Sequence, residues 1–210
     1  MEKMEFSRPE EIEKRSMDII ESELNGRRWP EPVFSIIKRC IHTSADLDYA
    51  DNLIFSEGAA LKGIAALRKG AHIITDTNMV LSGINKKVLR EYGGDAHCFI
   101  ADPDVVREAK ERGCTRAMVA MERGADLDRE IIYAVGNAPT ALFSIYDLMK
   151  SGKVSPKLVI AAPVGFVNII ESKDLIMSTD VPHIVAYGRK GGSNIAAAIC
   201  NAMLYSGIDI

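Results

Sequence analysis

The chain has 210 residues, a length that suits one domain, and its 47% hydrophobic and 26% charged residues are ordinary for a globular protein in water. Its net charge of -3 supplies no basic field, so we expect no nucleic-acid partner. No apolar run reaches the roughly 18 residues of a membrane span, and the charged start of the chain indicates no signal peptide. Four cysteines without CxxC spacing argue against a metal site and indicate reduced thiols, so we expect a cytoplasmic protein without a metal centre.

Residues 1–55 are predicted to form a helical N-terminal cap. Apolar residues recur at helical spacing before Gly26, and Ser16 interrupts their stripe. A second helix is predicted over about 32–42, and it ends in the polar, titratable stretch RCIHTSAD at residues 39–46. Such a helix end is either exposed to solvent, or it faces a ligand that takes up a proton and is attracted by positive charge.

Residues 56–210 are predicted to form an α/β core. A third helix is expected over about 57–69, and after it short apolar runs alternate with polar breaks and helical patterns. The runs are 72–75, 96–100, 131–135, 158–161 and 183–187. Continuously apolar strands separated by helices indicate an open, parallel, five-stranded sheet with helices on both faces. We therefore predict one domain over 1–210.

The segment GRKGGS, residues 188–193, lies between the last predicted strand and the last helix. Ligands of open α/β sheets bind beyond the carboxyl ends of the strands, where the next helix offers free N–H groups. Adjacent glycines allow close approach of the backbone, and Arg189 and Lys190 add charge. The pattern favours an anion site over a turn whose basic residues merely face water. It matches neither GxxxxGK[ST] nor GxGxxG, so a dinucleotide is disfavoured.

A second turn of this kind is GNAPTAL, residues 136–142. Asn137 can cap the following helix and Pro139 suits its first turn. Helix capping alone explains this turn as well as ligand contact does.

His42 is the candidate acid or base. It lies three residues after Arg39, so both side chains project from one side of the last helical turn. Imidazole exchanges protons near neutral pH, and a helix C-terminus favours its cation. The competing interpretation is a surface histidine that caps the helix. His72, His97 and His183 begin apolar strands, which indicates structural roles. The residues thus predict an α/β protein that binds a polyanionic small molecule and has one candidate acid/base histidine.

Six segments, found in one order along the chain, resemble the precorrin-8X (cobalt-precorrin-8) methylmutase family of corrinoid biosynthesis. They are IHTSAD at 41–46, GCTRA at 113–117, GNAPTAL at 136–142, PVGFV at 163–167, ESK at 171–173 and GRKGGS at 188–193. The resemblance spans about 12–204. It implies an isomerase that moves a methyl group from C-11 to C-12 of a contracted tetrapyrrole and yields hydrogenobyrinate, or cobyrinate when the substrate carries cobalt. It also implies no cofactor, because any cobalt is part of the substrate.

The resemblance further implies a flavodoxin-like fold and a homodimer that holds the tetrapyrrole near the subunit interface, with a possible hand-over to neighbouring enzymes of the pathway. His42 matches the family's catalytic histidine. The implied substrate-binding residues are Ser16, Arg39, Thr43, Arg116, Asn137, Thr140, Arg189, Lys190, Gly191, Gly192 and Ser193.

Two other functions fit the same pattern. A nucleotide- or phosphate-binding sensor would use the loop at 188–193, and His42 would then be dispensable. A corrinoid carrier would bind the macrocycle without converting it. Conversion of an added tetrapyrrole would indicate the isomerase. Tight binding without conversion would indicate the carrier, and no binding would indicate the sensor.

Overall fold

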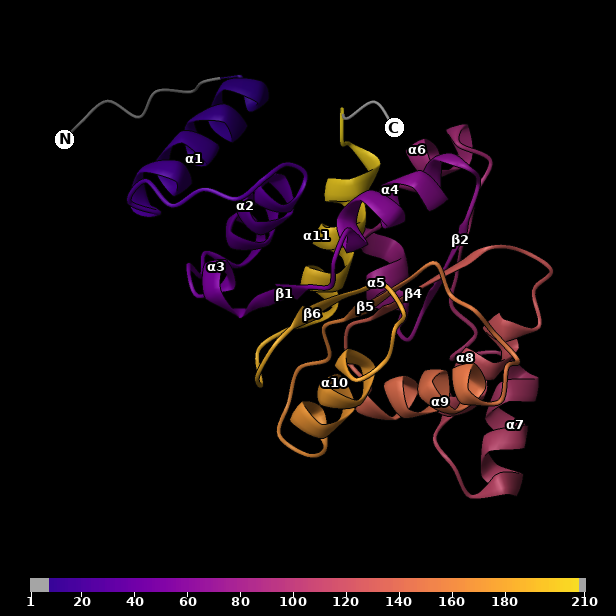
Figure 1. The fold of residues 1–210 in the computed structure, drawn as a ribbon. Helices are drawn as coiled ribbons and strands as arrows, with labels where there is room; N and C mark the ends of the chain where they lie inside the picture. Colours follow the sequence, from indigo (N-terminus) through magenta and orange to yellow (C-terminus); the bar gives the residue numbers. More distant parts are fainter. Residues whose placement is uncertain (1–7, 208–210) are drawn as a thin grey trace.

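The computed structural model describes residues 8–207 and shows an α/β fold with one central sheet (Figure 1). The strands are β1 (Leu53–Phe55), β2 (His72–Thr75), β3 (Ala96–His97), β4 (Ile131–Val135), β5 (Leu158–Ala161) and β6 (His183–Ala186). The longer helices are α1 (Pro9–Glu23), α2 (Val33–Ser44), α4 (Ala59–Arg68), α7 (Pro103–Arg112), α8 (Arg116–Ala125), α9 (Pro139–Lys150), α10 (Ile169–Met177) and α11 (Ser193–Leu204). The shorter ones are α3 (Tyr49–Asn52), α5 (Asn78–Gly83) and α6 (Lys86–Glu91).

The strand order is β1-β6-β5-β4-β2-β3, and all neighbours are parallel except β1 and β6. Without β1, the order along the chain is 2-1-3-4-5, which is the flavodoxin-like arrangement and confirms the predicted fold class. The strand order reverses between β2 and β4. Ligands of such sheets bind at this reversal.

The strand count corrects the prediction, because the sheet has six strands where five were expected. The additional strand, β1, comes from the segment predicted to be a purely helical cap, and Leu53 pairs with Ala186. Three apolar residues after a helical turn are too short a run to stand out in the sequence. A partner strand therefore decides their conformation.

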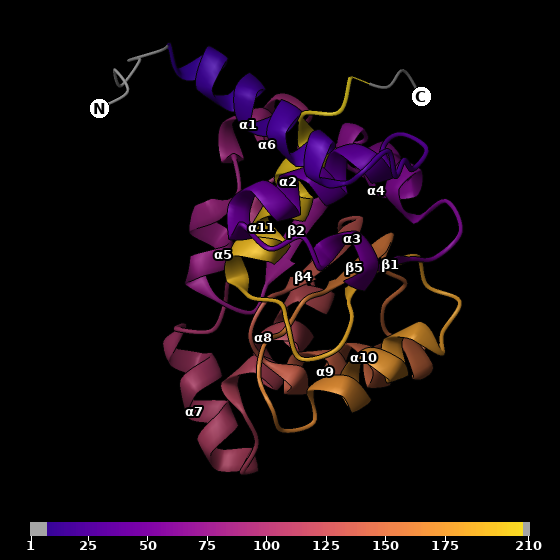
Figure 2. The same cartoon turned by 90° about the vertical axis from the view of Figure 1, so that its left-hand side faces the viewer.

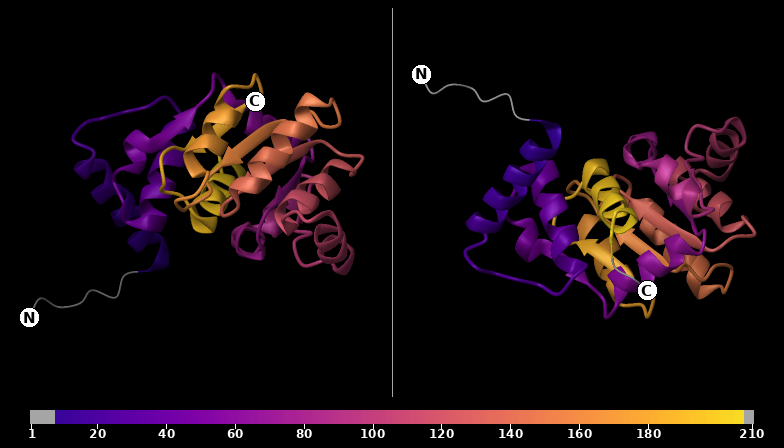
Figure 3. Two further views of the ribbon diagram at one scale, coloured as in Figure 1. Left: turned by 90° about the horizontal axis from the view of Figure 1, so that it is seen from below. Right: turned by 90° about the horizontal axis from the view of Figure 1, so that it is seen from above.

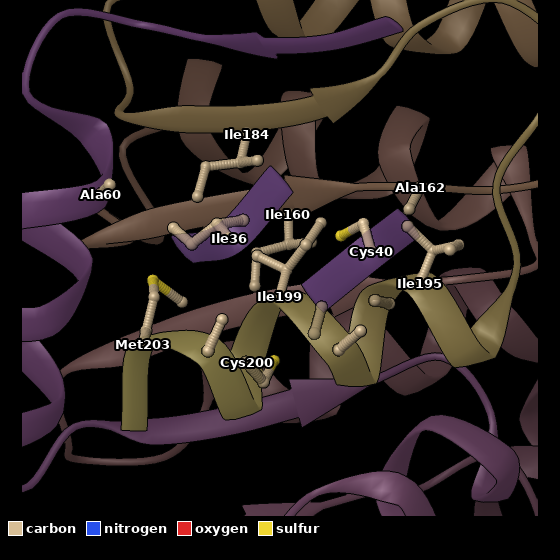
Figure 4. Close-up of a cluster of buried hydrophobic side chains, with 14 of the residues drawn as sticks. Ile36, Cys40, Ala60, Ile160, Ala162, Ile184, Ile195, Ile199, Cys200 and Met203 are labelled. Carbon is tan, nitrogen blue, oxygen red and sulfur yellow. The ribbon is translucent and has the colours of Figure 1, made fainter. Parts of the chain in front are cut away.

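Two hydrophobic layers cover the faces of the sheet. Residues alternate along β4, so that Ile132 and Ala134 pack with α2, α4 and α11 while Tyr133 and Val135 pack with α8 and α9. Figure 4 shows the first layer, in which Ile36 of α2 and Ile199 of α11 meet the side chains of β5 and β6. Every residue of β4 is buried, which explains its continuous apolar sequence.

The N-terminal cap is joined tightly to the core. Helix α2 packs against α11 (Figure 2), and α1 packs on the outside of α2. Figure 3 shows α1 and α2 at one end of the molecule and α7 at the opposite end. Cys40 and Cys200 are buried between α2 and α11, and burial raises the pKa of Cys200 to about 12, so this thiol stays protonated. No helix in residues 8–207 is long and apolar enough to cross a membrane.

Candidate active site

The turn after β4 is held by a buried aspartate at the reversal of strand order. Asp76 directly follows β2, and only 1% of its surface is exposed. Its carboxylate accepts hydrogen bonds from the backbone amides of Gly136, Asn137 and Ala138, at 2.8, 2.8 and 2.7 Å. Burial raises the pKa of Asp76, although these three amides oppose the shift. The aspartate therefore fixes the turn that carries Asn137 and leads to Thr140.

Thr140 connects this turn to the start of α8. The hydroxyl of Thr115 donates to the hydroxyl of Thr140 at 2.9 Å, and Thr115 also caps α8 by accepting from Met118 N. Arg116 is the first residue of α8; its side chain is exposed and makes no ion pair within residues 8–207. The predicted residues Arg116, Asn137 and Thr140 therefore lie in two adjoining helix starts, whose free N–H groups favour anions.

The loop at 188–193 lies directly against the turn after β4. A side chain on Gly136 would come within 2.6 Å of the Cα atom of Ser193, so only glycine permits this approach. The hydroxyl groups of Ser193 and Thr77 are 2.9 Å apart, which also ties the start of α11 to the segment after β2. Gly191 has φ 155°, and a side chain there would collide with the carbonyl oxygen of Ala162.

The two basic residues of this loop have different surroundings. The ammonium group of Lys190 lies 2.6 Å from both Asp46 and Asp48, so its charge is already neutralised by these carboxylates. Arg189 lies over the exposed ring of Phe166, at 5.4 Å from its centroid, and has no carboxylate partner among residues 8–207. The sequence predicted free charge at both positions. Only the guanidinium group of Arg189 is free of an ion pair.

Helix α2 ends abruptly just beyond His42. Ala45 adopts a left-handed conformation (φ 54°) and its amide bonds to the carbonyl of Ile41 at 2.7 Å. The hydroxyl of Ser44 donates to the carbonyl of Cys40 and accepts from the amide of Asp46. Ser44 and Ala45 therefore cap this helix, and the interpretation of His42 as the capping residue is not supported. The cap does not involve the imidazole of His42.

His42 and Ser16 line one hollow of about 380 Å³ between α1 and α2. The rest of its lining is mainly apolar and includes Ile19, Ile41 and Leu47. The exposed imidazole forms no hydrogen bond with any residue of the described range, and the hydroxyl of Ser16 donates to the carbonyl of Ile12 at 2.8 Å. The predicted residues Ser16 and His42, 26 positions apart in the sequence, are thus brought together. Thr43 is exposed next to His42.

Arg39 lies in a neighbouring hollow on the other side of the same helix pair. Its guanidinium group is 2.8 Å from the carboxylate of Glu13 and lies over the ring of Tyr205. The structure therefore does not place Arg39 in the hollow of His42, although both project from the C-terminal half of α2.

The cap and the carboxyl edge of the sheet are connected by polar contacts. Besides the ion pairs of Lys190, the hydroxyl of Tyr49 donates to the carbonyl of Gly191 at 3.4 Å. The end of α2, with His42, is therefore tied to the glycine loop. The two groups of predicted residues belong to one connected region.

The remaining titratable groups do not extend this region. His72 and His97 hydrogen-bond to each other across β2 and β3, and His183 bonds to the carbonyl of Val181. A hollow of about 770 Å³ lies at the opposite, amino edge of the sheet and contains none of the predicted site residues. Residues 8–207 contain no cluster of three histidine, cysteine or acidic side chains that could hold a metal ion.

Two residues of this region were not among the predicted site residues. Asp76 could have been found from its position directly after an apolar run at the sheet edge. Lys173 belongs to one of the family segments, but nothing in the sequence shows that it is buried.

The fold and these residues define a class: a flavodoxin-like α/β protein with several helix starts along one sheet edge and, beside them, a histidine without a hydrogen-bond partner in residues 8–207. The model of the precorrin-8X methylmutase family matches residues 11–206, and the chain belongs to this family. Its members are isomerases of cobalamin biosynthesis.

The similarity extends over nearly the whole of each relative. The cobalt-precorrin-8 methylmutase of Salmonella typhimurium is 44% identical, with 95% of this chain and 96% of the relative covered. The precorrin-8X methylmutase of Pseudomonas aeruginosa is 37% identical, with 91% and 93% covered. The crystal structure of the Thermus thermophilus precorrin-8X methylmutase superposes with a TM-score of 0.82 at 36% identity and covers 92% of this chain and 95% of that one.

Proposed function

We propose that the protein moves the methyl group of precorrin-8, or of its cobalt form, from C-11 to C-12, and so yields hydrogenobyrinate or cobyrinate. The observation that carries this proposal is the hollow in which Ser16 and His42 meet. An imidazole without a hydrogen-bond partner, in a mainly apolar hollow, is free to exchange a proton with a bound macrocycle. The curated relatives bear the names of both substrate forms.

His42 acts as the general acid in this proposal. A proton placed on the conjugated macrocycle makes it poorer in electrons and lowers the barrier to methyl migration, and the proton returns to the imidazole afterwards. Such catalysis typically contributes about 10²- to 10⁴-fold in rate. Product and substrate are isomers, so we infer that neither a redox cofactor nor a methyl donor takes part. Cobalt, where present, belongs to the substrate.

The carboxylates of the macrocycle are held by charge and by helix starts. Arg116 and Arg189 are free of ion pairs within residues 8–207 and provide planar guanidinium groups for bidentate bonds to carboxylates. Arg39 exchanges Glu13 for a substrate carboxylate. Asn137, Thr140 and the glycines of the 188–193 loop supply neutral donors. Lys190 holds the loop to Asp46 and Asp48.

A second copy of the chain completes the site. The hollow of His42, about 380 Å³, is at the small end of ligand pockets, and a tetrapyrrole exceeds it. Ile12 and Ile19 on α1 are 54% and 49% exposed near this hollow, as expected of a surface that another protein covers. We infer a cytoplasmic homodimer in which residues 1–210 form a single domain.

Product release that speeds up in the presence of the next pathway enzyme would reveal direct hand-over.

The test is to mix the purified protein with each tetrapyrrole form and record the visible spectrum. A time-dependent change to the spectrum of hydrogenobyrinate or cobyrinate supports the isomerase. A single static shift without conversion would instead show a carrier, and no shift would leave an anion sensor.

The role of His42 is tested by His42→Ala. We expect this variant to bind hydrogenobyrinate with unchanged affinity and to lose about 10²-fold or more in turnover. Lys62→Ala, at an exposed position on α4 outside the predicted site, is the control and should keep most of the turnover. Near-normal turnover by His42→Ala would remove the imidazole from the mechanism.

A further inference from the structure

The carbonyl groups of the glycine loop all point toward the protein. The carbonyls of Gly188 and Lys190 accept from the ammonium group of Lys173, at 2.7 and 3.0 Å. The carbonyl of Arg189 accepts from the amide of Gly165, and that of Gly191 accepts from the hydroxyl of Tyr49. Each acceptor of this stretch therefore has an internal donor.

Three successive amide groups of the same stretch are free, whereas the amide of Gly192 donates to the carbonyl of Ala162 at 2.8 Å. Within residues 8–207, the N–H groups of Arg189, Lys190 and Gly191 have no hydrogen-bond acceptor. The first amides of α11, at Ser193 and Asn194, follow after Gly192, and they also lack an intrahelical acceptor. Successive free amides of this kind form an anion-binding concavity. The unbonded backbone groups of this stretch are therefore donors and not acceptors.

Lys173 is the only side chain in the described structure that bonds to two carbonyls of this loop. It lies on α10 with 0% of its surface exposed, and it has no carboxylate partner among residues 8–207. Burial lowers its pKa to about 8. A buried ammonium group destabilises a fold relative to an apolar side chain of similar size. Stability alone does not explain a lysine here.

We propose that Lys173 is a positioning residue for substrate binding: it holds the carbonyls of Gly188 and Lys190 inward, so that the free amides of the loop face the carboxylates of the macrocycle. Its positive charge lies behind the same amides and strengthens their attraction for an anion. This inference rests on the proposed function, because it requires a substrate rich in carboxylates.

The test is Lys173→Met, which keeps the length of the side chain and removes its charge and donors. We expect the dissociation constant for hydrogenobyrinate and the KM to rise at least about tenfold, because several charge-assisted contacts weaken together. We expect kcat to stay within about threefold of the wild-type value, since His42 is untouched. Because the carbonyls of Gly188 and Lys190 lose their donor, the thermal midpoint should fall, and circular dichroism at the assay temperature checks that the variant is folded.

Lys86→Met is the matched control. Lys86 also donates to a backbone carbonyl, that of Leu81, but it belongs to α6, which adjoins the C-terminal half of α11 through Asn85 and Asn201. Its loss should leave the affinity for hydrogenobyrinate unchanged.

A folded Lys173→Met protein that binds hydrogenobyrinate within about twofold of the wild type would overturn the inference, as would a fall in kcat at unchanged KM. If that variant does not fold, Lys173→Gln, which keeps a shorter uncharged donor, takes its place. It should bind at least about fivefold more weakly, and wild-type affinity would equally refute the role. Wild-type protein that does not bind hydrogenobyrinate would instead refute the proposed function.

Discussion

Arg39 illustrates how one side chain combines a structural partner with a proposed role in binding. It is paired with Glu13 on α1 and lies over the ring of Tyr205 after α11. Partly exposed ion pairs contribute little to stability, about 0–1 kcal/mol. The ion pair with Glu13 therefore adds little to the stability of the fold, and Arg39 can exchange it for a ligand carboxylate at small cost.

We predict that Arg39→Ala raises the dissociation constant for hydrogenobyrinate about 10- to 100-fold while the unfolding midpoint in urea changes little. Titration followed by visible absorbance measures the first quantity and circular dichroism the second. Arg27→Ala is the control, because Arg27 likewise pairs with an aspartate, Asp51, and lies over an aromatic ring, that of Trp29. Equal affinities for all three proteins would exclude Arg39 from the site.

The burial of Lys173 also has a consequence for stability against pH. Its pKa is lowered to about 8 in the folded protein, below the ordinary value of 10.5. Between these two values the unfolded chain binds a proton that the folded chain does not, so this group makes stability rise as pH rises. The total effect is at most about 3 kcal/mol, since one pKa unit corresponds to about 1.4 kcal/mol.

We therefore predict that, from pH 8 to 10, the free energy of unfolding of the wild type increases relative to that of Lys173→Met. Urea denaturation of both proteins at each pH measures this difference, and the groups that both proteins share cancel. A difference that is constant across this range would show that the folded-state pKa of Lys173 is not lowered.

Among the secondary-structure elements, three strand ends are held together by Asp76 and its neighbour Thr77. Its carboxylate receives the amides that follow β4, and its neighbour Thr77 contacts Ser193 at the start of α11. The segments after β2, β4 and β6 thus form one rigid edge. Rigid support of this kind keeps Asn137 and the loop at 188–193 in a fixed position relative to each other.

We predict that Asp76→Asn destabilises the protein by about 1.5–3 kcal/mol, because an amide cannot accept from all three N–H groups. Urea denaturation measures the loss, and the affinity for hydrogenobyrinate should fall as well. Asp102→Asn is the control: Asp102 follows β3 at the same edge but makes no side-chain cap bond, so its replacement should change stability by less than about 0.5 kcal/mol. Equal stabilities of the two variants would contradict the fastening role.

For the whole molecule, the notable surface is the outer side of the cap. Ile12, Ile19 and Leu47 are exposed there, and Ile19 and Leu47 line the hollow of His42. A second copy of the chain on this surface would bury these side chains and enclose the macrocycle. Association and activity would then depend on the same residues.

We predict that wild-type protein has twice the 23.0 kDa mass of one chain by light scattering, and that Ile19→Asp lowers the mass to that of one chain and reduces turnover. A buried charge without a partner opposes association. Val106→Asp on α7, at the opposite end of the molecule, should keep both the mass and the turnover. A monomeric wild type with full turnover would refute the proposed dimer.

The order of apolar runs and helical patterns along the chain is enough to predict the fold class, because strands buried on both faces need continuous apolar runs and the intervening helices need their own periodicity. The sequence also predicts His42 and the loop at 188–193 as site candidates, since a titratable residue or a pair of glycines at the end of an element can be recognised without a structure. Contacts made on folding decide that Leu53–Phe55 form a strand, that Lys190 is neutralised by Asp46 and Asp48, and that Lys173 is buried under the loop. These three facts depend on partners 15 to 144 positions away, and local sequence patterns do not record such long-range contacts.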